Sequence, residues 1–285
     1  PRRSPPRSPL DENSNGSSRA SALPLWSLRG WPHEPLGGVV ADTLVIIPTY
    51  NEIDSLERIV GRLRQSVPEV DLLVVDDASP DGTGDLAERL AAADPHLTVL
   101  HRHAKDGLGR AYLAGFDVAL SGGYQYVVEI DADGSHDPAS LPAMLALARA
   151  GNDLVIGSRW VKGGAVANWP WVRQAISRAG NWYARVALRS SIRDITAGFR
   201  VYRASALRDL DLSAVSSQGY CFQVELAWQL ERTGHRIAEH PITFVERATG
   251  RSKMHSGIVL EALVRVTIWG VTYAPIFSWP RRERR

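Results

Sequence analysis

The feature that most constrains this chain is a regular alternation between short, unbroken apolar runs and longer stretches with helical periodicity. The apolar runs have the length of β-strands and lie at 43–47, 72–75, 97–100, 126–130 and 154–156. Apolar residues recur at helical spacing in the segments 53–63, 86–90, 108–120 and 138–149. Strands that are apolar at every position are buried on both faces. The pattern therefore predicts an α/β fold with a mostly parallel sheet and helices on both of its faces.

The two ends of the chain differ from this central part. Residues 1–38 are rich in Pro, Ser and Arg and lack apolar periodicity, so we expect a disordered tail or linker there. A proline-rich start of this kind is typical of a linker that follows an upstream membrane domain or partner, and it is equally typical of a trimmed terminus. We expect the folded domain over 39–256 and amphipathic C-terminal helical structure over 257–285. This last segment carries Glu261 and Arg265, so no uncharged apolar run is long enough to predict a transmembrane helix.

Charge and cysteine content exclude several classes of protein. The 33 Lys and Arg residues nearly balance the 31 Asp and Glu residues, so there is no global basic field for binding nucleic acid. The single cysteine, Cys221, excludes a disulfide framework and a Cys-rich zinc module. It also indicates a domain that folds in a reducing compartment.

Polar residues follow three of the predicted strands. The sequences are P-T-Y-N-E at 48–52, D-D-A-S-P-D-G-T at 76–83 and D-A-D-G-S-H-D at 131–137. Ligands of such sheets bind at the carboxyl ends of the strands, so we expect these loops to meet at one edge. Carboxylates gathered there repel one another unless a cation or hydrogen-bond donors neutralise them.

Asp131 and Asp133 are candidates for a metal site. Residues two apart at a strand end face the same side, so both carboxylates can approach one hard cation. Mg²⁺ or Mn²⁺ is typically held by one or two carboxylates together with the phosphate oxygens of a substrate. An isolated D-x-D sequence is common, and it also suits a turn that Asp131 caps and Asp133 solvates. Its place at the end of the fourth strand favours the metal site.

The Asp76-Asp77 pair also has two interpretations. It suits an ordinary Asx turn, and Asp81-Gly82 is typical turn sequence. Alternatively, Asp77 forms a hydrogen bond to a base or ribose, and Val75 lines the same pocket. The P-T-Y-N-E loop one strand away favours this second interpretation.

Seven motifs, in order between about residues 42 and 272, carry a resemblance to a known family. Besides the three loops above, they are G-S-R at 157–159, D-I-T-A-G-F-R at 194–200, G-Y-C-F-Q at 219–223, and E-R at 246–247 with S-K at 252–253. Together they resemble the family 2 glycosyltransferases, which have the Rossmann-like GT-A fold. More narrowly, they are similar to the polyprenol-phosphate (dolichol-phosphate) mannosyltransferases.

The resemblance implies a role for each matching position. The donor, GDP-mannose, would be bound by Pro48, Tyr50, Glu52, Val75, Asp77, Ala132, Arg247 and Lys253. The metal would be held by Asp131, Asp133 and Ser135. The acceptor phosphate would be bound by Arg159, Arg173 and Ser177. Asp131, Asp133 and Arg159 would form the catalytic group. Gly134 departs from the family pattern, in which a larger apolar residue is expected.

The implied activity is a Mg²⁺- or Mn²⁺-dependent, inverting transfer of mannose from GDP-mannose to a polyprenyl phosphate. The acceptor phosphate is already anionic at neutral pH, so a strong general base is dispensable. Considered without the resemblance, Arg159 also suits a surface salt bridge, and the basic loop around Arg247 and Lys253 also suits a solvated turn. The assignment of Arg173 and Ser177, which are four residues apart on one helix face, rests mainly on the resemblance.

The apolar stretches 168–188 and 257–279 are rich in Trp and Tyr. Helices there either pack on the sheet or dip into a bilayer surface beside the polyprenyl tail. The terminal arginines at 281, 282, 284 and 285 suit an anionic membrane. We therefore expect a peripheral protein at the cytoplasmic face of the membrane.

Three alternatives remain at this point. A processive polysaccharide synthase usually has a Q-x-x-R-W motif and several membrane helices, and neither is found in this sequence. A polyprenyl-phosphate glucosyl or aminosugar transferase would use a UDP-sugar. A non-catalytic partner with the same fold would have no need of the charged residues Asp131, Asp133, Arg247 and Lys253.

Overall fold

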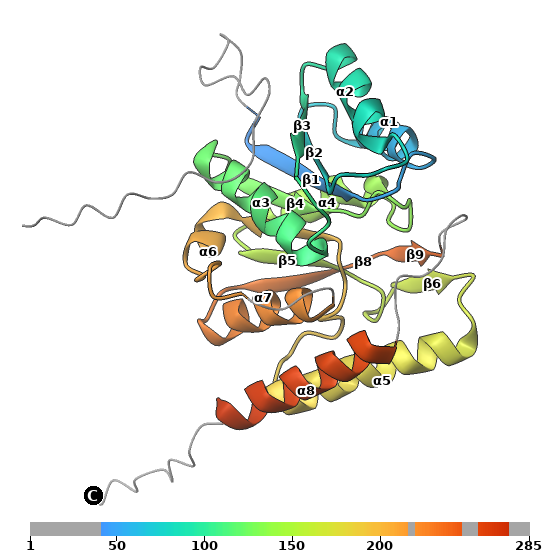
Figure 1. Cartoon of the computed structure of the whole chain (residues 1–285). Helices are drawn as coiled ribbons and strands as arrows, with labels where there is room; N and C mark the ends of the chain where they lie inside the picture. Colours follow the sequence, from blue (N-terminus) through green and yellow to red (C-terminus); the bar gives the residue numbers. More distant parts are fainter. Residues whose placement is uncertain (1–40, 216–219, 247–255, 274–285) are drawn as a thin grey trace, which may run out of the picture.

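The computed structural model describes residues 41–215, 220–246 and 256–273 (Figure 1). The predicted tail at 1–38, the donor residues Arg247 and Lys253, and the terminal arginines lie outside these residues. The limits of the predicted domains therefore stay predictions.

A seven-stranded sheet forms the centre of the molecule, in the order β3-β2-β1-β4-β7-β5-β8. Its strands are β1 (Thr43–Thr49), β2 (Asp71–Asp76), β3 (Leu97–His101), β4 (Tyr126–Glu129), β5 (Leu154–Ser158), β7 (Arg200–Arg203) and β8 (Ile237–Pro241). All neighbouring pairs are parallel except those made by β7, which is antiparallel to both β4 and β5. The predicted mostly parallel sheet is confirmed, and six strands end at the same edge. Two short parallel strands, β6 (Ala165–Ala167) and β9 (Thr243–Val245), form a separate sheet.

Helices cover both faces of the sheet, as predicted (Figure 1). One face carries α1 (Leu56–Ser66), α2 (Thr83–Ala93) and α4 (Leu141–Arg149). The other carries α3 (Leu108–Ser121), α6 (Ala204–Arg208) and α7 (Tyr220–Arg232). The two resulting hydrophobic clusters bury the alternate side chains of the same strands, which explains why the strands are apolar at every position.

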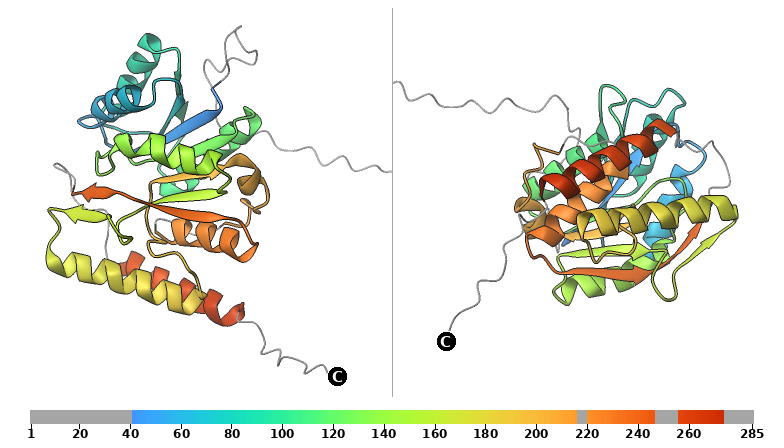
Figure 2. Two further views of the ribbon diagram at one scale, coloured as in Figure 1. Left: turned by 180° about the vertical axis from the view of Figure 1, so that it is seen from behind. Right: turned by 90° about the horizontal axis from the view of Figure 1, so that it is seen from below.

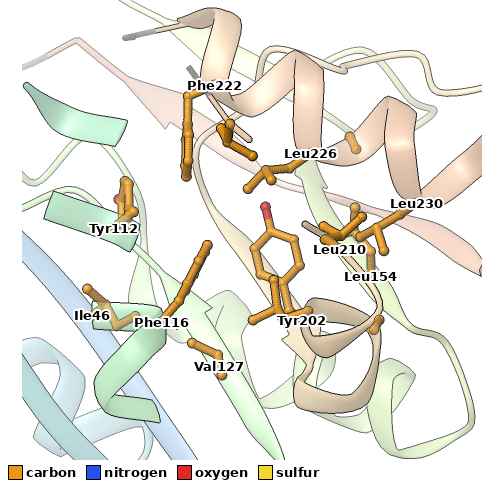
Figure 3. Close-up of a cluster of buried hydrophobic side chains, with 14 of the residues drawn as sticks. Ile46, Tyr112, Phe116, Val127, Leu154, Tyr202, Leu210, Phe222, Leu226 and Leu230 are labelled. Carbon is orange, nitrogen blue, oxygen red and sulfur yellow. The ribbon is translucent and has the colours of Figure 1, made fainter. Parts of the chain in front are cut away.

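Aromatic rings fill the core between α3, α7 and β7 (Figure 3). Phe116 lies between Tyr112, Phe222 and Tyr202, with ring centroids 5.6–6.5 Å apart. Helix α3 approaches β1 so closely that a Cβ on Gly115 would lie 2.7 Å from a methyl carbon of Ile46. Only glycine fits this contact without a shift of the neighbouring side chain.

Some predicted elements differ from the structure in their limits. Strand β4 ends at Glu129, so Asp131 and Asp133 lie in the following turn, and strand alternation does not explain their placement. The predicted helix at 138–149 is a 3₁₀ turn, η1 (Pro138–Ser140), followed by α4. Asp137 caps this turn by accepting a hydrogen bond from the Ala139 amide at 3.0 Å.

Helices α5 (Trp171–Leu188) and α8 (Ser256–Thr272) lie side by side beneath α7 and form an outer layer (Figure 2). A Cβ on Gly270 would lie 2.5 Å from the Ala187 carbonyl oxygen, so the two backbones are in close contact. Tyr183 and Thr267 are joined by a hydrogen bond between their hydroxyl groups. Within the described part of the chain, no helix combines the length and the apolar character needed to cross a bilayer.

Candidate active site

The loops after β1 and β2 are joined by hydrogen bonds at the carboxyl edge of the sheet. The backbone amides of Asn51, Glu52 and Ile53 donate to the side chains of Ser79, Thr83 and Asp81, respectively. Asp81 also accepts two hydrogen bonds from Thr83, at 3.0 Å from its amide and 2.6 Å from its hydroxyl group. The predicted turn at Asp81-Gly82 is confirmed, with Gly82 in the left-handed region at φ 90°. The first two motifs therefore form one structural unit.

Two of the predicted donor residues at this edge contact basic side chains. The Lys105 ammonium lies 4.0 Å from the centre of the Tyr50 ring. The Arg102 guanidinium donates to the buried Asp77 carboxylate at 2.5 Å. Burial raises the pKa of Asp77, and the Arg102 charge opposes this shift without cancelling it. Asp76, in contrast, is used internally, because it accepts hydrogen bonds from Thr49 and Ser79.

The other predicted donor residues differ in their exposure. Pro48, Val75 and Ala132 are buried, and the Val75 side chain belongs to the hydrophobic core. Glu52 is half-buried, and its carboxylate accepts a hydrogen bond from the Ser55 hydroxyl group at 2.8 Å.

Asp131 and Asp133 lie in the turn after β4 and are both partly exposed. Asp131 accepts a hydrogen bond from the Tyr112 hydroxyl group at 3.3 Å, and Asp133 accepts one from the Ser135 amide at 2.9 Å. Ser135 is buried, so its backbone supports Asp133 directly. Among the described residues, no group of three or more His, Cys, Asp or Glu residues could hold a metal alone. Two carboxylate ligands fit a hard cation that completes its shell with phosphate oxygens and water.

Two buried titratable residues flank this turn without adding charge to it. Burial lowers the pKa of His136 to about 4, so its ring is neutral at pH 7. Burial raises the pKa of Glu129 to about 8, which keeps most of this carboxyl group protonated at pH 7. The negative charge of the turn is thus concentrated on Asp131 and Asp133.

Arg159, directly after β5, is held by a buried carboxylate. Its Nε and Nη2 donate to the two Asp194 oxygens at 2.7 and 2.6 Å, and its amide donates to the same group at 2.8 Å. Arg159 also donates to the Thr196 hydroxyl group at 3.0 Å. The ion pair is buried rather than on the surface, and its bidentate geometry fixes the plane of the guanidinium.

The structure brings Arg173 and Ser177 of α5 close to Arg159. The Trp169 ring contacts both guanidiniums, with Cζ 4.2 Å from its centre for Arg173 and 5.6 Å for Arg159. Asn181 donates from one amide nitrogen to the Ser177 carbonyl at 3.0 Å and to the Thr196 hydroxyl group at 3.1 Å. The three predicted acceptor residues are therefore neighbours. Arg173 also forms an ion pair with Glu246 at the end of β9.

The segment that leads into β7 connects the metal and acceptor parts of the site. At its start, Asp194 holds Arg159, and further along, a Cβ on Gly198 would lie 3.7 Å from an Asp131 carboxylate oxygen. Phe199 contacts His136 with ring centroids 5.4 Å apart. One short segment thus holds Arg159 and passes beside Asp131.

The sequence profile described as glycosyl transferase family 2 matches residues 44–211. The chain belongs to this family. It is 59% identical over 228 residues to a protein of Micrococcus luteus named undecaprenyl-phosphate mannosyltransferase, covering 80% of this chain and 93% of the relative. It is 54% identical over 230 residues to polyprenol monophosphomannose synthase of Mycolicibacterium smegmatis, covering 80% and 87%. The family assignment makes the chain a glycosyltransferase enzyme.

Solved structures with the same fold are more distant in sequence. Glucosyl-3-phosphoglycerate synthase from Mycobacterium tuberculosis, in complex with phosphoglyceric acid, has a TM-score of 0.59 and 20% identity, covering 80% of this chain and 79% of that one. Its complex with Mn²⁺, UDP and glucosyl-3-phosphoglycerate has a TM-score of 0.56 and 21% identity, covering 80% and 78%. These similarities confirm the GT-A fold.

In this family 2 glycosyltransferase, Gly134 lies in the left-handed region at φ 75°, and a Cβ there would meet no atom within 4 Å. Backbone conformation rather than lack of space therefore favours glycine where the family pattern led us to expect a larger residue.

Sequence reasoning missed four residues that shape the site. They are Arg102, Lys105, Tyr112 and Asp194. Asp194 begins one of the seven motifs, and its acidic character was the available signal, but only the pairing of β7 with β5 brings it to Arg159. The other three have no local signature, because only the folded chain brings them to the carboxyl edge.

Proposed function

We propose that this enzyme transfers mannose from GDP-mannose to a polyprenyl phosphate, with inversion at the anomeric carbon, in a reaction that depends on Mg²⁺ or Mn²⁺. The products are polyprenyl-phosphate mannose and GDP. The observation that carries the proposal is the 194–200 segment, which holds Arg159 through Asp194 and passes beside Asp131 at Gly198. The names of the two bacterial relatives support the acceptor and the sugar.

Asp131 and Asp133, supported by Ser135, are the residues that would hold the divalent cation. When bound, the cation supplies charge neutralisation for the leaving nucleoside diphosphate. The Mn²⁺ and UDP in the distant structural neighbour support such a site in this fold. Arg247 and Lys253 would contact the same diphosphate, and Pro48, Tyr50, Glu52, Val75, Asp77 and Ala132 would surround the rest of the donor.

Arg159, Arg173 and Ser177 would position the acceptor phosphate. A phosphate monoester is anionic at neutral pH, so its oxygen attacks the anomeric carbon without a strong general base. Attack opposite the leaving diphosphate converts an α-linked donor into a β-linked product. The contribution of these residues is positioning and charge stabilisation.

The acceptor lipid places the enzyme at a membrane surface, which we propose to be the cytoplasmic face. Exposed side chains on α5 and α8 support peripheral attachment, because Trp171, Trp182 and Val271 are 78%, 65% and 73% exposed. Aromatic and aliphatic side chains of this kind are found in helices that lie in the bilayer interface.

A donor-choice assay tests the proposal. The purified enzyme is given Mg²⁺ or Mn²⁺, a polyprenyl phosphate and radiolabelled GDP-mannose or UDP-glucose, and the label is followed into organic solvent. We expect transfer from GDP-mannose only, lost on chelation of the metal, with a β-linked product. Transfer from UDP-glucose would contradict the donor assignment, and an α-linked product would contradict the inverting mechanism.

A further inference from the structure

A second concave site lies beside the proposed acceptor residues, between α5 and the segments that follow β5 and precede β7. It has a volume of about 300 Å³ and is lined by Trp160, Arg178, Asn181, Trp182, Arg185 and Arg193. None of these residues belongs to the proposed donor, metal or acceptor groups. We call this site the arginine pocket.

The arginine pocket holds three positive charges and no acidic lining residue. Within the described residues, the guanidiniums of Arg178, Arg185 and Arg193 form no ion pair with Asp or Glu. Arg178 instead lies on the Trp160 ring, with its Cζ 4.6 Å from the ring centre. Cations gathered without counter-charge raise the energy of the folded state, and a bound anion relieves this repulsion.

Two residues that line the arginine pocket each carry a buried hydrogen-bond donor with no acceptor among the described residues. The indole Nε1 of Trp160 and the Nε of Arg185 are both buried, and neither has a hydrogen-bond partner in the described part of the chain. Buried donors are nearly always paired, so each calls for an acceptor from outside the described part of the chain. The oxygens of a phosphate group match the charge of the three guanidiniums, and a rotation of the Trp160 and Arg185 side chains would bring the two buried donors to them.

The position of the arginine pocket indicates where such a phosphate comes from. Trp182 lines the pocket and is 65% exposed, and the exposed Ile176 and Val186 lie on the same helix. Helix α8, which lies beside α5, adds the exposed Ile268 and Val271 (Figure 2). An anion site among exposed apolar side chains suits a molecule with a phosphate head and a hydrocarbon tail.

We propose that the arginine pocket binds the headgroup phosphate of an anionic phospholipid and so fixes the α5–α8 face on the bilayer. Asn181 lines the pocket and also donates to Thr196, which accepts from Arg159. The pocket phosphate is therefore next to the proposed acceptor site. The inference rests on the proposed function only in that the acceptor reaches Arg159 from this same bilayer.

Binding to vesicles of phosphatidylglycerol and phosphatidylcholine tests the proposal, with full-length protein and neither donor nor acceptor present. The key variant is Arg185→Lys, and the matched control is Arg189→Lys, on an exposed residue that ends the same helix outside the pocket. Both substitutions keep the positive charge, but lysine lacks the planar guanidinium group with its several N–H donors. We expect Arg185→Lys to weaken vesicle binding about fivefold or more, and Arg189→Lys to leave it unchanged.

A charge-neutral variant provides a second test. Trp160→Phe removes one N–H group, and we expect it to weaken binding to the same vesicles severalfold while the melting temperature stays within a few degrees. Equal binding by wild type and both pocket variants would overturn the proposal in favour of diffuse attraction. Binding of sn-glycerol 3-phosphate as tight as binding of vesicles would overturn the lipid assignment.

The two proposals fail in different ways. Vesicle binding is measured without sugar transfer, whereas transfer is assayed with a detergent-dispersed acceptor and no phosphatidylglycerol. If the wild-type enzyme binds vesicles but transfers no mannose, the proposed function alone is contradicted. If mannose transfer is normal and the pocket variants bind vesicles as well as the wild type does, only the proposed role of the arginine pocket is contradicted.

Discussion

Asp194 binds the Arg159 guanidinium through both of its carboxylate oxygens, and both residues are buried. The family resemblance implies that Arg159 binds the acceptor phosphate. On the proposed function, Asp194, from the segment before β7, therefore fixes the guanidinium in place before the acceptor binds. A fixed guanidinium loses little entropy when it binds a phosphate.

Asp194→Asn should therefore affect both stability and catalysis. Removing one partner of a buried ion pair leaves the other uncompensated, so we expect a loss of about 3 kcal/mol in the free energy of unfolding. The KM for the lipid acceptor should also rise, and denaturant unfolding and steady-state kinetics measure the two effects. Asp209→Asn, which removes an exposed partner of His235, should cost less than about 1 kcal/mol. Equal effects of the two substitutions would contradict this role of Asp194.

Asp131→Asn and Asp133→Asn should each lower mannosyl transfer about 100-fold or more, because the leaving diphosphate loses its neutralising cation. Binding of Mn²⁺ in the presence of GDP, followed by electron paramagnetic resonance, should weaken in parallel. Asp137→Asn is a matched control in the same segment, since Asp137 caps η1 and pairs with Arg62. Its activity should stay within a fewfold of wild type. Retention of Mn²⁺ binding in both of the first two variants would contradict the metal site.

Asp81→Ala should destabilise the joined loops after β1 and β2 at neutral pH. Burial alone would raise the pKa of Asp81, but hydrogen bonds from Thr83 and Ile53 outweigh it and lower this pKa below its ordinary value of 3.8. The charged form therefore contributes stability above pH 3.8 that is lost as the pH falls through the lower folded-state pKa. We expect a difference of about 1 kcal/mol from wild type at pH 7. This difference in the free energy of unfolding should shrink below pH 3.8. If it is unchanged in acid, the charge of Asp81 does not contribute to stability.

Gly270→Ala should loosen α8 from α5, because the added Cβ would lie 2.5 Å from the Ala187 carbonyl oxygen. We expect a cost of about 1–3 kcal/mol in the docking of this helix, read as faster hydrogen exchange of the α8 amides. Gly180→Ala on α5 is the matched control, since its Cβ would meet no atom within 4 Å. That variant should be neutral or more stable by about 0.5–1 kcal/mol. If the α8 amides of Gly270→Ala exchange as slowly as those of the wild type, the close contact between Gly270 and Ala187 is contradicted.

The strands with continuous apolar sequence, such as β1 and β2, could be predicted because burial on both faces requires apolar side chains at every position. Strand β7 could not, because it has only four residues and begins and ends with arginine. Arg200 is fully buried there, where backbone carbonyls of Ile195, Ala197 and Gln223 accept its hydrogen bonds. No local pattern shows that distant carbonyls will satisfy a buried guanidinium.

The same limit applies to the candidate site. The loops after β1, β2 and β4 were predictable because parallel strands end at one edge. The contact between Lys105 and Tyr50 and the bidentate pair of Arg159 depend on side chains from separate loops. Their proximity follows from the strand order, which a single sequence does not determine.

The insertion of β7 between β4 and β5 also has a consequence for biosynthesis. Residues up to Glu129 contain the four strands β1 to β4, but β7, the second partner of β4, is completed 74 residues later, at Arg203. At typical translation rates, the free edge of β4 stays unpaired for roughly 4–15 s. Unpaired strand edges are templates for aggregation. The strand that lies between the two parts of the candidate site thus leaves β4 with an exposed edge in the nascent chain until the ribosome has passed Arg203.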